Sequence, residues 1–383
     1  MTIITEEEEA EECNSLLNPE IPKQNLKTHY LKQNIITIMS LVCIILLVLL
    51  KFSLVSSCLS HNKILITGIN GLIGSHIASA ILSNKDYDHC DIIYGLVRFN
   101  SRLDNLKGIL NQITLVKGDI TDSHRMNQII KTIQPTIIYH LSAQAINGVS
   151  FENPSLTLRV NIDGTLNILE ALKNNGLYHT RFIFAGSSTE YGKSANTKQP
   201  LNENTRLQPI TPYGVSKTSG ELLSLQYFYT FNIPVIILRF FIQIGVGGTD
   251  SLSIQQFCKQ IAQIEKGIHP PILYHGNLNS IRDISDVRDM SPVIIHISEH
   301  GIPGEIYNIG TGEGIETRQL LLEAVRQSKV DNIELRADPS LFRLADEEIL
   351  IADVSKVRKL IDIPKLNITK TIASILQDWR QRV

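Results

Sequence analysis

The chain has 383 residues and a formal net charge of −2 at pH 7. This length supports one large domain or two smaller ones, and the near balance of charge argues against a nucleic-acid-binding protein. The five cysteines, at positions 13, 43, 58, 90 and 258, lack the paired spacing of a disulfide framework or a zinc site, so we expect no bound metal.

The first sixty residues differ in composition from the remainder. Residues 6–12 read EEEEAEE, and we expect residues 1–33 to form an acidic flexible tail. No charged residue interrupts Ile35–Leu50, and with its flanks this run reaches the roughly 20 residues that a membrane-spanning helix needs. A buried core helix is the alternative. We predict a single-pass transmembrane anchor over residues 34–60, with the membrane contact at residues 35–50.

The lysines on either side of this run bear on its orientation. Lys23, Lys27 and Lys32 precede the run, whereas Lys51 and Lys63 follow it. Basic residues favour the cytoplasmic side of a membrane, so the excess of one lysine predicts a cytosolic tail. The enzyme domain is then expected on the lumenal or external side, as in the Golgi or endoplasmic reticulum if the source is eukaryotic.

From Lys63 onward, short runs rich in β-branched residues alternate with helical stretches. The expected strands read KILIT, DIIYGLV, ITLVKG, TIIYHLS, RFIFAGS and VIILRF. Runs so continuous in apolar residues are typical of parallel strands that are covered on both faces. The alternation predicts an α/β fold with a doubly wound parallel Rossmann sheet in residues 61–245. A smaller C-terminal substrate lobe is expected in residues 246–383, with segments of the two interleaved.

A glycine-rich loop joins the first expected strand to the first expected helix. Residues 68–74 read GINGLIG. Gly68 permits a tight turn, Gly71 lets a pyrophosphate approach the backbone, and Gly74 lets helix and strand pack closely. The place between a strand and a helix favours cofactor binding over a purely structural turn. We assign the other loop residues Asn70, Leu72 and Ile73 to the same site.

The end of the second expected strand bears on the choice of cofactor. A carboxylate there would bind the ribose hydroxyls of NAD, but the chain has Arg98, Ser101 and Arg102, which suit the 2′-phosphate of NADP. A solvated basic loop is the alternative, and NAD stays possible. Asp119 and Ile120, after the third strand, are expected at the adenine edge, although Asp119 fits a turn equally well.

Tyr213 is the only tyrosine of the chain with a lysine, Lys217, four residues on. The two side chains share a face if this segment is helical, so we expect the lysine to lower the phenol pKa toward neutrality for proton exchange. Upstream, residues 186–192 read GSSTEYG at the end of a strand. A hydroxyl there would bind the reacting sugar oxygen, although ordinary strand-end capping also explains these serines.

Together these motifs make the chain similar to the extended short-chain dehydrogenase/reductase family over residues 63–383. The motifs are T-G-x-x-G-x-x-G, G-D-[LI]-x-D at residues 118–122, and Y-x-x-x-K. HLSAQAINGVSFENP resembles the segment that GDP-mannose 4,6-dehydratases and GDP-4-keto-6-deoxy-D-mannose reductases carry after the fourth strand. The forms of GSSTEYG, TPYGVSKTSGELL and GNLNSIRDISDVRD resemble the reductase branch more closely.

The resemblance implies roles for particular residues. Those with catalytic roles are Ser188, Tyr213 and Lys217. Leu141 and Ala143, with Tyr213 and Lys217, are expected to contact the cofactor, and Gln144, Arg282 and Arg343 a GDP-linked nucleotide sugar. Glu190 is either the base that a dehydratase uses to remove the C5 proton or a solvated loop residue. The expected assembly is a homodimer.

Two positions depart from the family pattern. Ile242 replaces an asparagine that normally touches the substrate diphosphate, and Leu344 replaces the proline of an arginine-proline motif. Three hypotheses follow. The leading one is a membrane-anchored, NADP-dependent reductase acting at C4 of a GDP-4-keto-6-deoxyhexose. The others are a dehydratase or epimerase that recycles its cofactor, and a cofactor-binding scaffold without catalytic activity.

Overall fold

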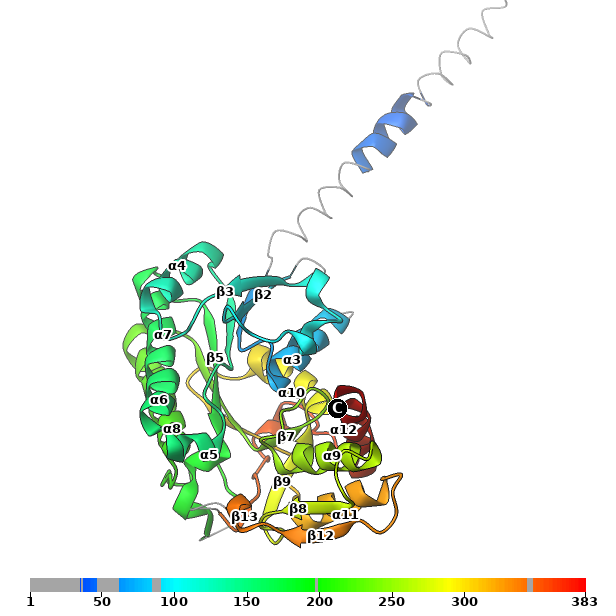
Figure 1. Ribbon diagram of the computed structural model, residues 1–383. Helices are drawn as coiled ribbons and strands as arrows, with labels where there is room; N and C mark the ends of the chain where they lie inside the picture. Colours follow the sequence, from blue (N-terminus) through cyan, green and yellow to red (C-terminus); the bar gives the residue numbers. More distant parts are fainter. Residues whose placement is uncertain (1–34, 36, 47–61, 85–90, 197–198, 343–346) are drawn as a thin grey trace, which may run out of the picture. The chain divides into compact units, whose positions relative to one another are not determined.

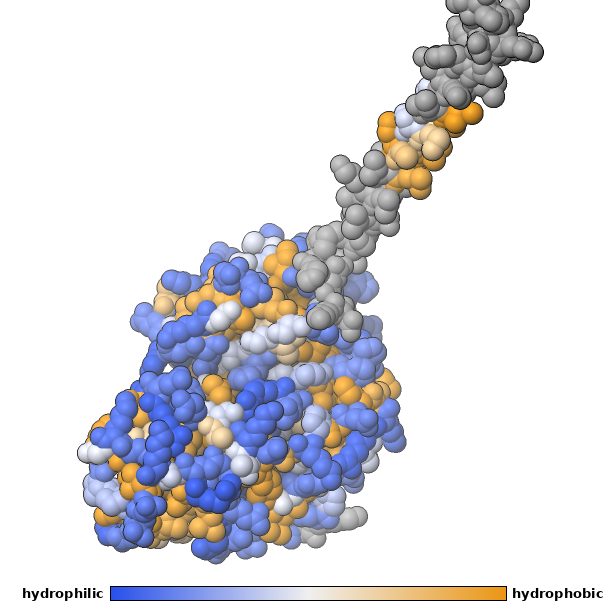
Figure 2. All heavy atoms as spheres, turned by 90° about the vertical axis from the view of Figure 1, so that its right-hand side faces the viewer, coloured by the Kyte–Doolittle hydropathy of each residue, from blue (hydrophilic) through white to orange (hydrophobic). Residues whose placement is uncertain are grey.

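The computed structural model describes residues 35, 37–46, 62–84, 91–196, 199–342 and 347–383. The chain divides into two compact units, Met1–Ser60 and His61–Val383. In the first unit, residues 37–46 are helical and expose apolar side chains, which Figure 2 colours orange. Among the described residues, no helix is both long and apolar enough to cross a membrane. The predicted tail and most of the predicted anchor lie outside the described residues.

The second unit is built on a parallel sheet of seven strands (Figure 1). In spatial order the strands are β10 (Ile306–Ile309), β6 (Val235–Phe240), β5 (Arg181–Ser187), β4 (Ile137–His140), β1 (Lys63–Thr67), β2 (Ile92–Val97) and β3 (Thr114–Lys117). The order reverses between β1 and β4, which is where doubly wound sheets bind their ligands. The predicted Rossmann sheet is confirmed, and β10 is a strand that the sequence did not predict.

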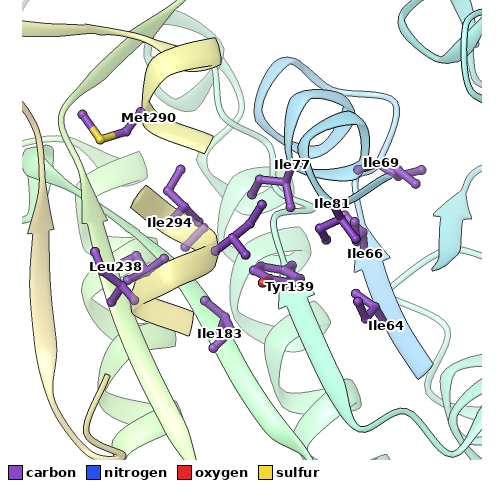
Figure 3. Packing of buried hydrophobic residues seen from close by; sticks show 14 of the residues in the cluster. Ile64, Ile66, Ile69, Ile77, Ile81, Tyr139, Ile183, Leu238, Met290 and Ile294 are labelled. Carbon is purple, nitrogen blue, oxygen red and sulfur yellow. The ribbon is translucent and has the colours of Figure 1, made fainter. Parts of the chain in front are cut away.

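Helices cover both faces of this sheet (Figure 1). On one face are α3 (Leu72–Ser83) and α10 (Val287–His300), and on the other α4 (Ser123–Ile133), α7 (Gly164–Asn174) and α8 (Pro212–Phe231). Because strand side chains alternate, Ile64 and Ile66 pack toward α3 and α10, whereas Leu65 packs toward α4 and α7. Figure 3 shows the first of these clusters, in which Ile77 of α3 and Ile294 of α10 meet over the sheet.

The smaller lobe has its own apolar core beside two short sheets. In one sheet, β9 (Ile281–Asp286) is antiparallel to β11 (Gly314–Glu316) and parallel to β7 (Ile242–Ile244) and β13 (Ile349–Leu350). The other pairs β8 (Ile272–His275) with β12 (Glu334–Ala337). The helices that pack on this core are α9 (Ser253–Glu265), α11 (Thr317–Arg326) and α12 (Ile368–Arg382).

The large sheet and the smaller lobe are interleaved along the chain. Both α10 and β10 lie beyond residue 245 in sequence, yet α10 packs on the large sheet and β10 pairs with β6. Such exchange between lobes is what the sequence led us to expect. The boundary at residues 245 and 246 itself stays a prediction, because residues 61–383 form a single compact unit.

Candidate active site

The glycine loop between β1 and α3 leaves no room for larger side chains. Gly68 has φ +70°, and a Cβ on it would lie 3.0 Å from the backbone nitrogen of Ser142. A Cβ on Gly74 would lie 2.5 Å from the carbonyl oxygen of Gly68, closer than any real contact. No side chain caps α3 at Gly71, so the first N–H groups of the helix are free to bind an anion. This geometry fits the pyrophosphate of a dinucleotide.

Hydrogen bonds fix the segments on either side of the loop. Asn70 Nδ2 donates to the carbonyl of Arg102 at 3.2 Å. Asn105 Nδ2 donates to the carbonyls of Asn70 at 3.1 Å and Gly247 at 3.0 Å. Sequence reasoning missed Asn105, because a single asparagine in a turn carries no pattern. Its two bonds join the loop to residues that are far away in the chain.

The segment after β4 lies against the same loop. The backbone N–H groups of Leu141 and Ser142 both donate to the Thr67 hydroxyl at 3.1 Å. Ala143 follows and is half-buried. The predicted cofactor residues Leu141 and Ala143 are therefore brought next to the end of β1, where the glycine loop begins.

The Gln144 side chain is engaged in holding its own loop. Its Nε2 donates to the carbonyl of Ile146 at 3.1 Å and to the Thr157 hydroxyl at 2.9 Å, and its Oε1 accepts the Ile146 N–H at 2.6 Å. The predicted contact of this amide with substrate stays a prediction. Asn161, in the π-helical turn Arg159–Asp163, bonds both the N–H and the carbonyl of Gln144.

Asn161 also donates to the Ser216 hydroxyl at 2.8 Å, next to Lys217 in α8. It thus links the Gln144 loop to the helix that carries the predicted catalytic pair. Sequence reasoning missed Asn161. A π-helical turn, which often marks a functional site, leaves no periodic signal in the sequence.

An open pocket of about 880 Å³ lies beyond the end of β2. Its lining residues are Arg98, Phe99, Asn100, Ser101, Gly118, Asp119, Asp122 and Arg125. The predicted Arg98 and Ser101 therefore share a pocket, and Arg125 adds a second guanidinium that the sequence did not single out. Arg102 does not line this pocket: it pairs with Asp104 at 2.9 Å and its side chain is 87% exposed. The two arginines of the pocket suit a 2′-phosphate.

Asp119 is both a wall of this pocket and a turn residue. Its Oδ1 accepts hydrogen bonds from the N–H and the hydroxyl of Thr121 at 2.9 and 2.8 Å. Burial opposes its ionisation, but these bonds and the charges of Arg98 and Arg159 outweigh burial and lower the pKa of Asp119. Asp119 can therefore be a turn residue and still lie at the edge of a bound adenine.

The side chain of Ile120 faces the protein core rather than the pocket. It is buried among the apolar residues of α4 and α7, and a Cβ on Gly164 would lie 2.5 Å from its Cδ1. Its carbonyl accepts a hydrogen bond from Asn167 at 2.9 Å. The apolar side chain of Ile120 gains more from the core than from solvent, so the predicted place of Ile120 at the adenine edge stays a prediction for its backbone alone.

Tyr213 and Lys217 lie in the first two turns of α8, as their spacing predicts. The Lys217 ammonium donates to the carbonyl of Ala185 in β5 at 2.7 Å and lies 5.9 Å from the centre of the Tyr213 ring. The Ser187 hydroxyl, which bonds the Thr189 hydroxyl at 2.9 Å, lies close enough to the Tyr213 phenol to lower its pKa by hydrogen bonding. The hydroxyl beside the tyrosine is thus that of Ser187, one residue before the predicted Ser188, which opens the 3-10 turn Ser188–Glu190.

The ionisation of this pair differs from the expected one. Burial raises the pKa of Tyr213 to about 12, against the lowering effect of its bond with Ser187. Burial also lowers the pKa of Lys217 to about 8. The prediction that Lys217 brings the phenol pKa toward neutrality was wrong, because both groups lose solvation inside the protein. At neutral pH the phenol therefore keeps its proton.

Glu190 is neither a solvated loop residue nor placed as a base. Its side chain is fully buried, and its Oε1 accepts the Ser187 N–H at 2.6 Å. Burial, followed by the charge of Glu221, raises the pKa of Glu190 well above its usual value. Both predicted readings of Glu190 were therefore wrong, because the side chain turns into the protein, toward Arg239 of β6 and Glu221 of α8.

The predicted substrate contacts of the smaller lobe are described only in part. The buried guanidinium of Arg282, in β9, donates to the carbonyls of Ile281, Glu347 and Glu348 at 2.9, 2.6 and 3.1 Å. Arg343 lies outside the described residues. Ile242, the departure from the family pattern, packs half-buried against the apolar core of the lobe.

Comparison with known proteins agrees with these features. The chain is 28% identical to the GDP-6-deoxy-D-mannose reductase of Pseudomonas aeruginosa, over 84% of this chain and 98% of that protein. It is 30% identical to the GDP-mannose 4,6-dehydratase of Yersinia enterocolitica, over 82% of this chain and 93% of that protein. The solved structure of RMD from Pseudomonas aeruginosa complexed with NADPH is 26% identical, with a TM-score of 0.71, over 84% of this chain and 100% of that one.

The family model described as GDP-mannose 4,6 dehydratase matches residues 65–374, from the first strand into the last helix. This match includes the glycine loop, the Arg98 pocket and the Tyr213–Lys217 pair. It confirms the resemblance that the motifs predict. These two relatives are a nucleotide-sugar reductase and a nucleotide-sugar dehydratase, in agreement with the predicted NAD(P)-dependent enzyme. The chain belongs to the GDP-mannose 4,6 dehydratase family.

Proposed function

We propose that the protein is an NADP-dependent reductase that acts on the C4 carbonyl of a GDP-linked 4-keto-6-deoxyhexose. The observation that carries this proposal is the placement of Tyr213 beside Lys217, whose ammonium is held at the Ala185 carbonyl 5.9 Å from the tyrosine ring, next to the Ser187 hydroxyl. The raised pKa of Tyr213 agrees with a phenol that carries its proton at neutral pH. A proton donor is what carbonyl reduction requires of the protein. The reductase relative and the structure complexed with NADPH support the same choice.

Each residue of the site has a separate role in the proposed reaction. NADPH, when bound, supplies the hydride. Tyr213 donates its proton to the sugar oxygen, and Ser187 holds that oxygen through its hydroxyl. Lys217, with a pKa of about 8, is mostly protonated at neutral pH and stabilises the phenolate that Tyr213 becomes. Its bond to the Ala185 carbonyl fixes its position.

The dinucleotide fits the described residues at both ends. At the phosphates, the space beside Gly68 and Gly74 admits no side chain, and the uncapped start of α3 offers N–H groups. At the adenosine, Arg98, Ser101 and Arg125 line the pocket that we assign to the 2′-phosphate. A 2′-phosphate so placed would favour NADPH over NADH.

The stoichiometry of the cofactor tests the reductase. With a GDP-4-keto-6-deoxyhexose as substrate, we expect one NADPH to be oxidised for each sugar reduced, followed at the absorbance of NADPH and by mass spectrometry of the product. Product without net loss of NADPH would contradict the proposal and indicate a dehydratase or an epimerase.

The dehydratase is the second candidate, because the matched family model and the Yersinia enterocolitica relative carry that name. A dehydratase needs a carboxylate at the sugar to remove the C5 proton. Glu190 is buried away from solvent, and its raised pKa favours the protonated carboxyl, which cannot accept a proton from C5; this favours the reductase. The scaffold hypothesis rests on Ile242 alone. It predicts heat protection of the protein by NADPH and none by GDP-sugars.

The membrane anchor is part of the proposal. The charge-free run Ile35–Leu50 supports a single span, and the helical residues 37–46 expose apolar side chains, such as Ile38 at 62%. The lysine excess supports an enzyme domain on the lumenal or external side. We expect detergent, and not alkaline carbonate, to release the protein from membranes, and sealed vesicles to protect residues 61–383 from protease. Release by carbonate would contradict the anchor, and digestion in intact vesicles would contradict the orientation.

Exposed apolar side chains on α8 support the expected homodimer. Val215, Leu222 and Tyr229 are 42%, 59% and 71% exposed, and they recur every seven residues, so they share one face of the helix. An apolar stripe of this kind is typical of a helix-to-helix interface. We expect light scattering to give the mass of a dimer and Leu222→Asp with Tyr229→Asp to give that of a monomer. A monomeric unmodified protein would contradict the interface.

A further inference from the structure

Three ionisable side chains, one of them in the 3-10 turn Ser188–Glu190, form a buried cluster. Arg239 of β6 makes a two-pronged ion pair with Glu221 of α8, through bonds of 2.9 and 2.6 Å. Glu190 comes no closer to the Arg239 guanidinium than 4.0 Å, which is too long for a hydrogen bond. All three side chains are at most 3% exposed. The charge of Arg239 is thus matched by Glu221, and an ionised Glu190 would be unpaired.

A buried carboxyl in this position avoids ionisation. Burial and the neighbouring Glu221 raise the pKa of Glu190 well above its usual value, although Arg239 opposes them. Among the described residues, no hydrogen-bond partner reaches the Oε2 atom of Glu190. The carboxyl of Glu221 lies close enough to raise the pKa of Glu190 by its charge and by hydrogen bonding. Two carboxyl groups can bond each other only through a proton. A proton on Oε2 would give this oxygen a hydrogen bond to Glu221.

We infer that Glu190 is a neutral carboxylic acid that positions Ser187 for catalysis. Its Oε1 accepts the Ser187 N–H at 2.6 Å, which closes a capping box at the end of β5. We assign the proton of its Oε2 to a bond with Glu221, which is paired with Arg239. Gly186 leaves the space for this contact, since a Cβ there would lie 2.7 Å from Oε1. The backbone of Ser187 is thereby fixed, and with it the hydroxyl that bonds Tyr213.

Ionisation of Glu190 would disturb the site through its charge. The titratable and charged groups that face it are Glu221, Tyr213 and Lys217 of α8, Arg239 of β6, and Tyr191 beyond Arg239. A negative Glu190 raises the pKa of both Tyr213 and Lys217. The phenol then releases its proton less readily, so a reductase with an ionised Glu190 is slower. This consequence rests on the proposed function; the protonation of Glu190 does not.

Stability as a function of pH tests the protonation without any activity. The pKa of Glu190 is higher in the folded than in the unfolded chain, where 4.5 is usual, so between these values the folded state binds more protons. Stability therefore falls as pH rises through this window, relative to Glu190→Gln, which cannot ionise. We expect the ratio of the unfolding constants, unmodified over Glu190→Gln, to rise by about tenfold per pH unit. Equal slopes for the two proteins would overturn the inference.

Glu334→Gln serves as the matched control for this measurement. The Glu334 carboxyl is 55% exposed and pairs with Arg336 on the surface. We therefore expect the unfolding constant of Glu334→Gln to depend on pH as that of the unmodified protein does. An infrared band of a neutral carboxylic acid, present in the unmodified protein and lost in Glu190→Gln, is the spectroscopic counterpart. A protein that fails to oxidise NADPH but shows both the pH dependence of unfolding and the infrared band would contradict the reductase. It would still support a neutral Glu190.

Kinetics tests the positioning role. Glu190→Ala removes the acceptor of the Ser187 N–H, and we expect kcat to fall at least tenfold while the Kd for NADPH changes little. Glutamine offers the same acceptor and donor as the neutral acid, so Glu190→Gln should recover most of this loss. Its activity should also persist to higher pH than that of the unmodified enzyme. A folded Glu190→Gln as slow as Glu190→Ala, or with an unshifted alkaline limb, would refute the role of Glu190.

Discussion

The glycine loop and the catalytic group, by which we mean Ser187, Tyr213 and Lys217, lie at the same edge of the sheet but consist of different chemical groups. At the loop, residues 68–74 offer backbone N–H groups and empty space, and the adjoining pocket carries the exposed Arg98. At the catalytic group, Ser187 and Lys217 are buried and Tyr213 is half-buried. Tyr213 and Lys217 are titratable, and both respond to the charge of the buried Glu190. We propose that the loop binds the cofactor through its shape and backbone groups, and that the catalytic group transfers protons. Changes at the catalytic group should therefore lower kcat, and changes at the loop should weaken cofactor binding.

Tyr213→Phe should have the largest effect. The change removes the donated proton and leaves the ring and Lys217 in place, so we expect kcat to fall about 10²–10⁴-fold. The Kd for NADPH, measured by fluorescence titration, should stay within a few-fold. A variant that kept more than about a tenth of the activity would show that another group is the acid.

Ser187→Ala should come next, with Ser188→Ala as its matched partner. Removal of one hydroxyl that holds the reacting oxygen should lower kcat by roughly 10²-fold. Because the Ser187 hydroxyl bonds Tyr213, we expect the Ser188 variant to lose much less. Steady-state rates at saturating NADPH compare the two. The opposite ranking would restore Ser188 to the role that the family resemblance implies.

Arg98→Ala tests whether the pocket beyond the end of β2 binds the 2′-phosphate of NADPH. The loss of a charge-assisted hydrogen bond of about 1.5–3 kcal/mol should weaken NADPH binding by roughly 10- to 100-fold and leave NADH binding nearly unchanged. Arg102→Ala is the control, because Arg102 pairs with Asp104 and does not line the pocket. If both variants lost NADPH preference equally, the pocket would not be the 2′-phosphate site.

Gly74→Ala should have the smallest effect on the chemistry itself. Its Cβ would lie 2.5 Å from the Gly68 carbonyl, so we expect a loss of about 1–3 kcal/mol in the free energy of unfolding together with weaker NADPH binding. In Gly108→Ala the added Cβ meets nothing within 4 Å, so stability should not fall. Urea unfolding with and without NADPH measures both quantities. A Gly74 variant as stable as the control would mean that the loop tolerates a side chain.

The sequence predicted the elements whose signal is local. The six expected strands and the glycine loop follow from consecutive residues, and the Tyr213–Lys217 pair from the period of one helix. Burial of Glu190 could not be predicted, because it depends on Arg239 and Glu221, which other elements bring to it. The raised pKa of Tyr213 likewise follows from desolvation, which motif spacing does not report. β10 was missed because its pairing with β6 spans a long separation along the chain.

The interleaving of α10 and β10 with the smaller lobe bears on how the molecule can be divided. A chain cut after residue 245 would lose the edge strand beside β6 and the helix that covers Ile77, and would leave that face of the sheet open to water. A fragment that begins at residue 246 would lack β7, a partner of β9. Neither half is an autonomous module, so fusions, domain exchanges and genetic splits at this point should give insoluble products.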